Sequence, residues 1–172
     1  MTQNQTAQRP AAGAIDAKTF REGMSRIAST VHIVTTDGAA GRAGLTVTAM
    51  TPVSDEPPTL LVCINRLSTT NSILRRNGVF AVNVLPAGAD DLSNVFAGRD
   101  AAAGAKRFEH GTWSTGATGA PLLAGARVSF DCRITDIHDV GTHSIVIGTV
   151  VGAQLGARGA ALGYIDRDYR DL

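Results

Sequence analysis

Two stretches of the chain combine short hydroxyl-bearing side chains with neighbours suited to holding a cofactor. Residues 44–54 begin with alternating small polar and apolar side chains, and residues 57–71 run from an apolar segment into Ser68-Thr69-Thr70-Asn71. A flat ring approaches the main chain closely only where no large side chain intrudes, and the start of a helix binds anions. The two stretches predict a site for a flat, phosphorylated, aromatic cofactor, with a flavin as the leading hypothesis.

The polar run Ser68, Thr69, Thr70 and Asn71 has two interpretations. An ordinary helix N-cap needs only one such residue to satisfy the free backbone N–H groups. Four in succession, two positions after Arg66, offer several donors and a nearby cation to a phosphate. We favour the phosphate interpretation, with plain capping as the alternative.

The segment Thr46, Val47, Thr48 and Ala49 also has two interpretations. Taken alone, it is typical of a half-buried strand. The small size of its side chains favours a surface on which a planar ring lies against the backbone, with N–H groups in reach of its nitrogens and carbonyls. The sequence by itself leaves both interpretations open.

His143 is the histidine best placed for chemistry, because it follows Gly141 and Thr142 in a predicted turn and precedes a strand. An imidazole at such a rim can donate or accept a hydrogen bond, although a solvated turn histidine without a role is the simpler alternative. Tyr164 and Tyr169 are typical core or interface residues, and either could also flank a flat ligand.

Several other classes of site are disfavoured. The sequence has no H-E-x-x-H, G-x-S-x-G, G-x-x-x-x-G-K-[ST] or G-x-G-x-x-G motif. Cys63 and Cys132 lie in separate apolar runs and form no C-x-x-C pair, so neither a metal site nor a thiol redox site is expected. A net charge of +1 without a basic stripe argues against nucleic-acid binding.

The chain shows no segment suited to a membrane or to export. No apolar run approaches the ~20 residues that span a bilayer, and residues 1–15 lack the pattern of a secretion signal. We expect a soluble, cytoplasmic protein with a disordered tail at residues 1–15 and one domain over residues 16–172. The low charged content of 18% is consistent with surface covered by a second subunit.

The elements that must position the candidate residues are mostly strands. The run at residues 59–65 is continuously apolar, which predicts a strand covered on both faces. Because strands outnumber helices and no regular crossover helices separate them, we expect a mostly antiparallel barrel or sandwich with a few packed helices. Helices are predicted at residues 16–28, 69–77 and 89–98, and strands at 31–36, around 46, 59–65, 80–85, 127–135 and 144–151.

In this order, the segments resemble the flavin reductase-like family, small NAD(P)H:flavin oxidoreductases that serve as reductase components of two-component monooxygenases. Within that family the chain looks closest to the flavin reductases of pyrimidine utilisation, through Asp-Cys-Arg-Ile at residues 131–134 and Gly-Thr-His at 141–143. The resemblance extends from Phe20 to Tyr169. Its carriers are residues 20–24, 34–36, 44–49, 57–65, 80–85, 107–108 and 141–143.

The resemblance implies a mostly β fold, a split β-barrel of the FMN-binding, Greek-key type, which forms a homodimer with FMN or FAD in a groove near the subunit interface. It implies that His143 positions the nicotinamide. Thr142 stands where the family usually has an aspartate, so a carboxylate that would orient the imidazole is missing. The implied flavin contacts are Thr46, Val47, Thr48 and Ala49 along the isoalloxazine, Cys63, Ile64, Asn65 and Arg66 beside it, and Ser68, Thr69, Thr70 and Asn71 at the ribityl phosphate.

The implied reaction is hydride transfer from NADH or NADPH to the flavin, with the two rings stacked roughly 3–3.5 Å apart. Reduced flavin would then pass to a partner monooxygenase. One alternative is a flavoprotein that keeps its flavin and reduces a corrinoid, cob(II)yrinic acid a,c-diamide, to the cob(I) state, with the small residues of 98–119 leaving room for that acceptor. A second is a non-catalytic flavin-binding protein. An oxidase of the pyridoxamine-phosphate type fits the motifs poorly.

Overall fold

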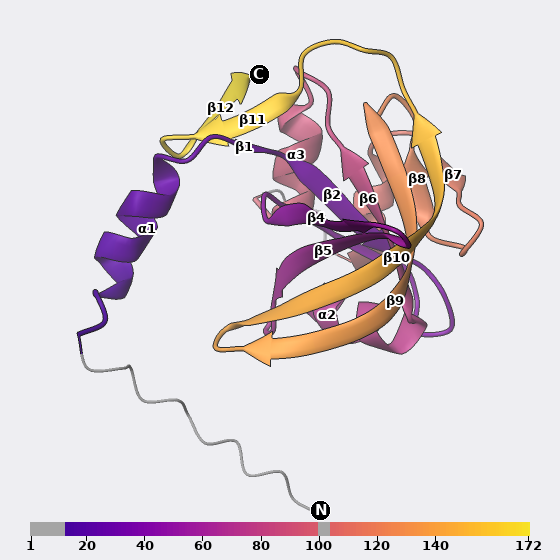
Figure 1. Cartoon of the computed structure of the whole chain (residues 1–172). Helices are drawn as coiled ribbons and strands as arrows, with labels where there is room; N and C mark the ends of the chain where they lie inside the picture. The colour runs from indigo at the N-terminus through magenta and orange to yellow at the C-terminus, as the bar shows by residue number, and fades with distance from the viewer. Residues whose placement is uncertain (1–12, 100–103) are drawn as a thin grey trace, which may run out of the picture.

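The computed structural model describes residues 13–99 and 104–172, so residues 1–12 of the predicted tail and residues 100–103 of segment 98–119 lie outside the described residues. Within the described part, the main feature is a seven-stranded sheet of order β3-β2-β6-β9-β10-β5-β4, antiparallel throughout (Figure 1). Its strands are β2 (His32–Thr36), β3 (Ala43–Val47), β4 (Met50–Asp55), β5 (Pro58–Asn65), β6 (Val79–Val84), β9 (Val128–Val140) and β10 (His143–Leu155).

The sheet curls into an open barrel because its two edge strands follow one another in sequence. β3 ends at Val47 and β4 begins at Met50, so the opposite edges of the sheet are held together by two residues. The Cys63 N–H also donates to the Ala49 carbonyl at 3.0 Å. The predicted mostly β, split-barrel fold is confirmed, and its open seam lies at residues 48–49.

Two smaller sheets and a turn of 3₁₀ helix flank the barrel. β1 (Ser29–Thr30), β11 (Leu162–Ile165) and β12 (Asp168–Asp171) form a three-stranded sheet near the C-terminus, and β7 (Trp113–Thr115) pairs with β8 (Pro121–Leu123) (Figure 1). The 3₁₀ helix η1 (Gly104–Glu109) precedes β7. The small C-terminal sheet joins the barrel through backbone hydrogen bonds of Leu162 with Val31 and Leu85, at 2.9 and 3.0 Å.

The described residues form three α-helices, and two of them begin at a side-chain cap. α2 (Thr69–Asn77) begins at the predicted Ser68 cap, whose side chain accepts from Thr70 N–H, and ends at Gly78 in the left-handed conformation. α1 (Ala17–Ser25) is capped by Asp16 and is shorter than the predicted 16–28 helix. α3 (Asp90–Phe96) carries two acidic residues in its first turn, where negative charges interact favourably with the helix dipole.

Beside a small cluster of Ala81, Ala120 and Leu122, the core consists of two larger clusters on opposite faces of the curled sheet. One fills the barrel under α2 and includes Phe80, Leu74 and Val146. The other packs α3 against the barrel wall, where Phe96 contacts Phe108 and Trp113 with ring centroids 5.2 and 5.4 Å apart. The barrel cluster also includes residues of β3 and β5, so it fixes the positions of these two strands.

One expectation about burial is wrong. The strand at residues 59–65 was expected to be covered on both faces, but in β5 only the face with Leu60, Val62 and Ile64 is buried in the core. Leu61 and Cys63 on the other face are half-buried. The reason is that this second face of β5 borders a cavity at the barrel seam, to which Cys63 contributes. A continuous apolar run thus marks a wall of the candidate site rather than a doubly covered strand.

Candidate functional site

A cavity of about 370 Å³ lies at the seam of the barrel. This volume lies in the range of small-molecule sites. Consecutive residues on β3 and the seam, 45–49, form one wall, and they include four of the predicted flavin contacts: Thr46, Val47, Thr48 and Ala49. The sequence prediction placed these four residues on a shared surface, and the fold brings them to one cavity.

The wall at residues 45–49, which we call the seam wall, has few protruding groups. Its side chains are small or already hydrogen-bonded within the protein. The Thr46 hydroxyl donates to the Ser93 carbonyl on α3 at 2.7 Å, so it is already hydrogen-bonded and ties β3 to α3. Val47 packs on the barrel core, while Thr48 and Ala49 are exposed. A planar ring can therefore approach the backbone at residues 47–49 without meeting a bulky side chain.

β5 and β10 supply a second wall. Cys63, Asn65 and His143 line the cavity, and His143 lies directly opposite Asn65 in the register of the two strands. Burial raises the pKa of the Cys63 thiol, so it stays protonated at neutral pH and is not a nucleophile. Ile64 alternates to the other side, and its side chain is fully buried in the barrel core.

His143 lies at the rim, where the hairpin between β9 and β10 turns. Its Nδ1 is 2.9 Å from the Thr142 hydroxyl, a hydrogen bond that fixes the orientation of the exposed imidazole. The sequence indicated that a carboxylate partner is missing here. The structure gives the ring a neutral hydroxyl instead, which orients the ring without adding a charge.

The polar run that opens α2 lies outside the residues that line the cavity. Ser68 Oγ accepts from Thr70 N–H at 3.2 Å, the Thr70 hydroxyl donates to the Gly44 carbonyl at 3.3 Å, and the Asn71 amide donates to Ser144 Oγ at 2.9 Å. Thr70 and Asn71 are each 3% exposed, so their side chains serve the protein interior, whereas Thr69 is exposed. Whether this run binds a phosphate stays a prediction.

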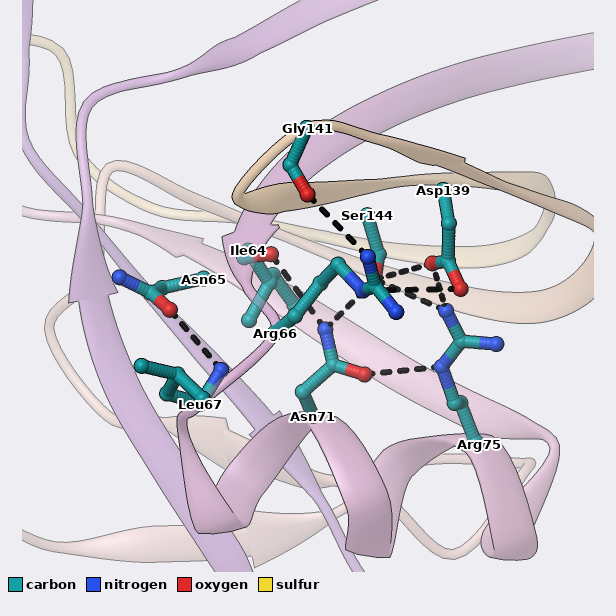
Figure 2. A network of polar contacts seen from close by, with 9 residues as sticks. All are labelled: Ile64, Asn65, Arg66, Leu67, Asn71, Arg75, Asp139, Gly141 and Ser144. Atoms are coloured by element: carbon teal, nitrogen blue, oxygen red, sulfur yellow. Dashed lines mark hydrogen bonds and ion pairs between the residues drawn. The ribbon is translucent and has the colours of Figure 1, made fainter. Parts of the chain in front are cut away.

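Arg66 lies between the cavity and α2. It follows Asn65, a cavity residue, and is exposed. Its Nη1 donates to the Gly141 carbonyl at 3.2 Å, and its Nε is 3.7 Å from Asp139 Oδ2 (Figure 2). Both of these contacts lie on the hairpin formed by β9 and β10, so the guanidinium is held against that hairpin.

The cavity is also lined by residues outside the set of predicted flavin contacts. Tyr164 and Tyr169, suggested as flanks for a flat ligand, both line it, with ring centroids 5.4 Å apart. Arg99 lines it too, donates to the Tyr164 hydroxyl at 3.4 Å, and has its pKa raised by that contact. No sequence pattern marked Arg99, because a single cation after a glycine carries no periodic signal. Val31 and Ala97 complete this side.

The described residues offer no group of three or more histidine, cysteine or acidic side chains that could hold a metal ion. They also contain no helix with the length and apolar character needed to cross a membrane. The arrangement that remains is a small-residue wall, two tyrosines, a rim histidine and a cation, which suits a planar organic ligand with an anionic part.

Comparisons with known proteins agree with this geometry. A family model described as a flavin reductase like domain matches residues 24–172. The chain is 50% identical over 153 residues to FMN reductase (NADH) RutF of Agrobacterium fabrum, covering 89% of this chain and 87% of that protein. It is 46% identical over 172 residues to FMN reductase (NADH) RutF 1 of Methylorubrum extorquens, covering 100% and 83%.

Solved structures give the same result. BorF, the flavin reductase component of a bacterial two-component tryptophan halogenase, superposes with a TM-score of 0.84 at 33% identity, over 91% of this chain and 98% of that one. The NADH:FAD oxidoreductase SgcE6 of Streptomyces globisporus superposes with a TM-score of 0.82 at 30% identity, over 92% and 96%.

Proposed function

This chain belongs to the flavin reductase-like family, and we propose on that premise that it is an NAD(P)H-dependent flavin reductase, which transfers hydride from NADH or NADPH to FMN or FAD. The resemblance inferred from the ordered motifs is confirmed by the family match. The observation that carries the proposal is the cavity of about 370 Å³ with small residues at 46–49 on one side and Tyr164 and Tyr169 in its lining.

The residues present fit a flavin. The bound flavin would supply the hydride acceptor and the nicotinamide the hydride. The seam residues Thr46, Val47, Thr48 and Ala49 would hold the ring against the backbone, and Cys63 and Asn65 would border it. His143 would fix the nicotinamide at the open rim. The work of the protein is then to align two rings and to exclude water between them.

For the flavin phosphate, we propose the start of α2. Its backbone N–H groups and the positive end of the helix dipole favour an anion. Arg66, Ser68 and Thr69 would contact the phosphate, while the buried Thr70 and Asn71 would hold the helix start in place through the hydrogen bonds described above.

The phosphate assignment is tested with Arg66→Ala and calorimetric titration of FMN and riboflavin. Charge-assisted contacts contribute about 1.5–3 kcal/mol, so FMN affinity should fall roughly ten- to hundredfold, and riboflavin affinity, which involves no phosphate, should hold. Arg76→Ala at the far end of α2 is the matched control. Equal losses for FMN and riboflavin would contradict a phosphate contact.

The catalytic proposal is tested by mixing the protein with NADH or NADPH and free FMN or FAD, and following the nicotinamide absorbance. Oxidation well above the protein-free rate is expected. No oxidation with either donor would favour the non-catalytic flavin-binding alternative. A protein that keeps its yellow colour through desalting would favour the corrinoid-reducing alternative, in which the flavin stays bound.

We also propose a cytoplasmic homodimer that supplies reduced flavin to a partner oxygenase. α1 buries no side chain in the described structure, and its Phe20 and Met24 are 56% and 48% exposed. A further cavity of about 370 Å³ lies against this helix and shares Thr48 and Tyr164 with the first, so a second subunit on α1 would cover the site.

The oligomeric state is tested by light scattering, which should give the mass of a dimer for the wild type. Phe20→Glu should give a monomer, and Lys18→Glu should leave the dimer intact.

A further inference from the structure

A polar network joins the β9–β10 hairpin to α2, with Asp139 at its centre (Figure 2). One carboxylate oxygen, Oδ1, is hydrogen-bonded by Arg75 Nη2 and by the Ser144 hydroxyl, the latter at 2.8 Å. The other oxygen, Oδ2, is 3.7 Å from Arg66 Nε. Arg75 on α2 and Arg66 just before α2 therefore share the Asp139 carboxylate on β9.

The network continues into the interior through Asn71. Its side chain accepts from Arg75 Nε at 2.8 Å and donates to Ser144 Oγ at 2.9 Å. Asn71 is 3% exposed and Ser144 is fully buried, so the inner half of the network is shielded from water. The hydrogen bond from Ser144, followed by the charges of Arg75 and Arg66, lowers the pKa of Asp139, which keeps it ionised at neutral pH.

Strand geometry connects this network to the cavity. Successive residues of a strand face opposite sides of the sheet; His143 lines the cavity, and Ser144 lies in the network behind it. The backbone that carries His143 is thus held from the rear. The Arg66 backbone N–H adds a hydrogen bond to the Thr142 carbonyl at 3.0 Å, and its guanidinium binds the Gly141 carbonyl.

The hairpin tip is held by backbone pairing with β5 and by these polar contacts rather than by core packing. Val140, Gly141, Thr142 and His143 are all exposed, so core packing does not fix their position. Among the described residues, Asp139 is the sole acidic partner of both Arg66 and Arg75. Removing its charge would leave two cations against the hairpin with no counter-charge.

We infer that Asp139 is a positioning residue of the reductase: by anchoring the β9–β10 hairpin to α2, it holds His143 at the rim where the nicotinamide enters. The inference rests on the proposed function. Asp139 does not line the cavity proposed for the flavin ring, and it acts on His143 through the position of the hairpin. A small displacement of a positioning group lowers the fraction of productive ring alignments.

The test is Asp139→Asn, which keeps the shape and removes the charge. Partly exposed ion pairs contribute about 0.2–1 kcal/mol, so the KM for NADH should rise by about two- to fivefold in steady-state assays with FMN. Asp139→Glu, which restores a carboxylate, should return KM toward the wild-type value. Riboflavin affinity should not change, because no contact of the network reaches the seam wall, and Tm should fall by no more than about 2–4 °C.

Two further variants sharpen the result. Asp136→Asn is the matched control, because Asp136 lies on the same strand and pairs with His138 at 2.9 Å rather than with α2; its KM should equal that of the wild type. Arg75→Gln breaks the same anchor from the helix side and should reproduce the KM shift. It also keeps the inference testable if Asp139→Asn folds poorly.

If the wild type is active and the KM for NADH is unchanged in both Asp139→Asn and Arg75→Gln, the inference about Asp139 is wrong and the proposed function still stands. The inference would also be overturned by an equal rise in Asp136→Asn, or by a rise accompanied by lost riboflavin affinity and a fall in Tm well beyond that small shift, since either result points to general disruption. A wild-type protein that oxidises neither NADH nor NADPH would overturn the proposed function, and the inference with it.

Discussion

His32 should make the stability of this protein depend on pH. The side chain lies on β2, is 1% exposed, and contacts the Thr30 hydroxyl through Nε2 at 3.0 Å. Its Nδ1 has no hydrogen-bond partner among the described residues. Burial lowers the pKa of His32 from 6.5 to about 4, because a charged imidazolium there would lose its hydration without gaining an acceptor for Nδ1.

The size and sign of the effect follow from this difference. As pH falls below 6.5, the unfolded chain takes up a proton at this histidine, whereas the folded protein takes it up only near pH 4. The contribution of neutral, buried His32 to the stability of the folded protein is therefore complete above pH 6.5 and is lost as pH falls toward 4. Since one pKa unit corresponds to about 1.36 kcal/mol, the free energy of unfolding should drop by about 3 kcal/mol across that window.

The assay is urea unfolding followed by circular dichroism at several pH values between 7.5 and 4. His32→Gln, which cannot titrate but keeps a polar group near Thr30, is the comparison. The wild type should lose most of the expected amount between pH 6.5 and 4, and the variant should show a much flatter profile. Equal pH dependence in the two proteins, or a flat wild-type profile, would refute the assignment to His32.

Three further substitutions test separate parts of the structure. Gly148→Ala would bring a Cβ 2.5 Å from the ring of the buried Phe80, so urea unfolding should show a loss of about 1–3 kcal/mol. Gly78→Ala meets no atom within 4 Å, but its φ of +70° is left-handed; the expected loss of about 1–2 kcal/mol comes from the backbone alone, and an unchanged midpoint would argue against it. Thr142→Val removes the hydrogen bond to His143, worth about 0.5–1.5 kcal/mol, so the KM for NADH should rise about two- to tenfold at constant riboflavin affinity.

Features set by neighbouring residues could be predicted from the sequence. α2 begins at the Ser68 cap and spans the predicted residues 69–77, because helix ends depend on side chains within one turn. The alternation at residues 127–135 likewise predicted a strand, and Phe130 and Cys132 contact the barrel core. The placement of His143 at a turn also followed from local sequence alone.

Features that depend on residues far apart in the chain could not be predicted from the sequence. Arg99 and Tyr164 meet at the cavity across 65 residues of sequence, with 3.4 Å between Arg99 Nη2 and the tyrosine hydroxyl, and no local pattern encodes that approach. The run at residues 59–65 is uniformly apolar, so it could not reveal which face borders a cavity. That was decided by β3 and β4 meeting at the barrel seam.

The sequence by itself determined six of the strands (β2, β3, β5, β6, β9 and β10), the helix starts and the small-residue segment 46–49, because these follow from side-chain size, periodicity and capping over a few residues. The tertiary structure alone decided which polar groups are free to meet a ligand. Thr70 and Asn71 looked like anion ligands, yet they are buried and bonded to Gly44 and Ser144, since a hydrogen-bonding side chain is claimed by whichever partner the fold brings within about 3 Å.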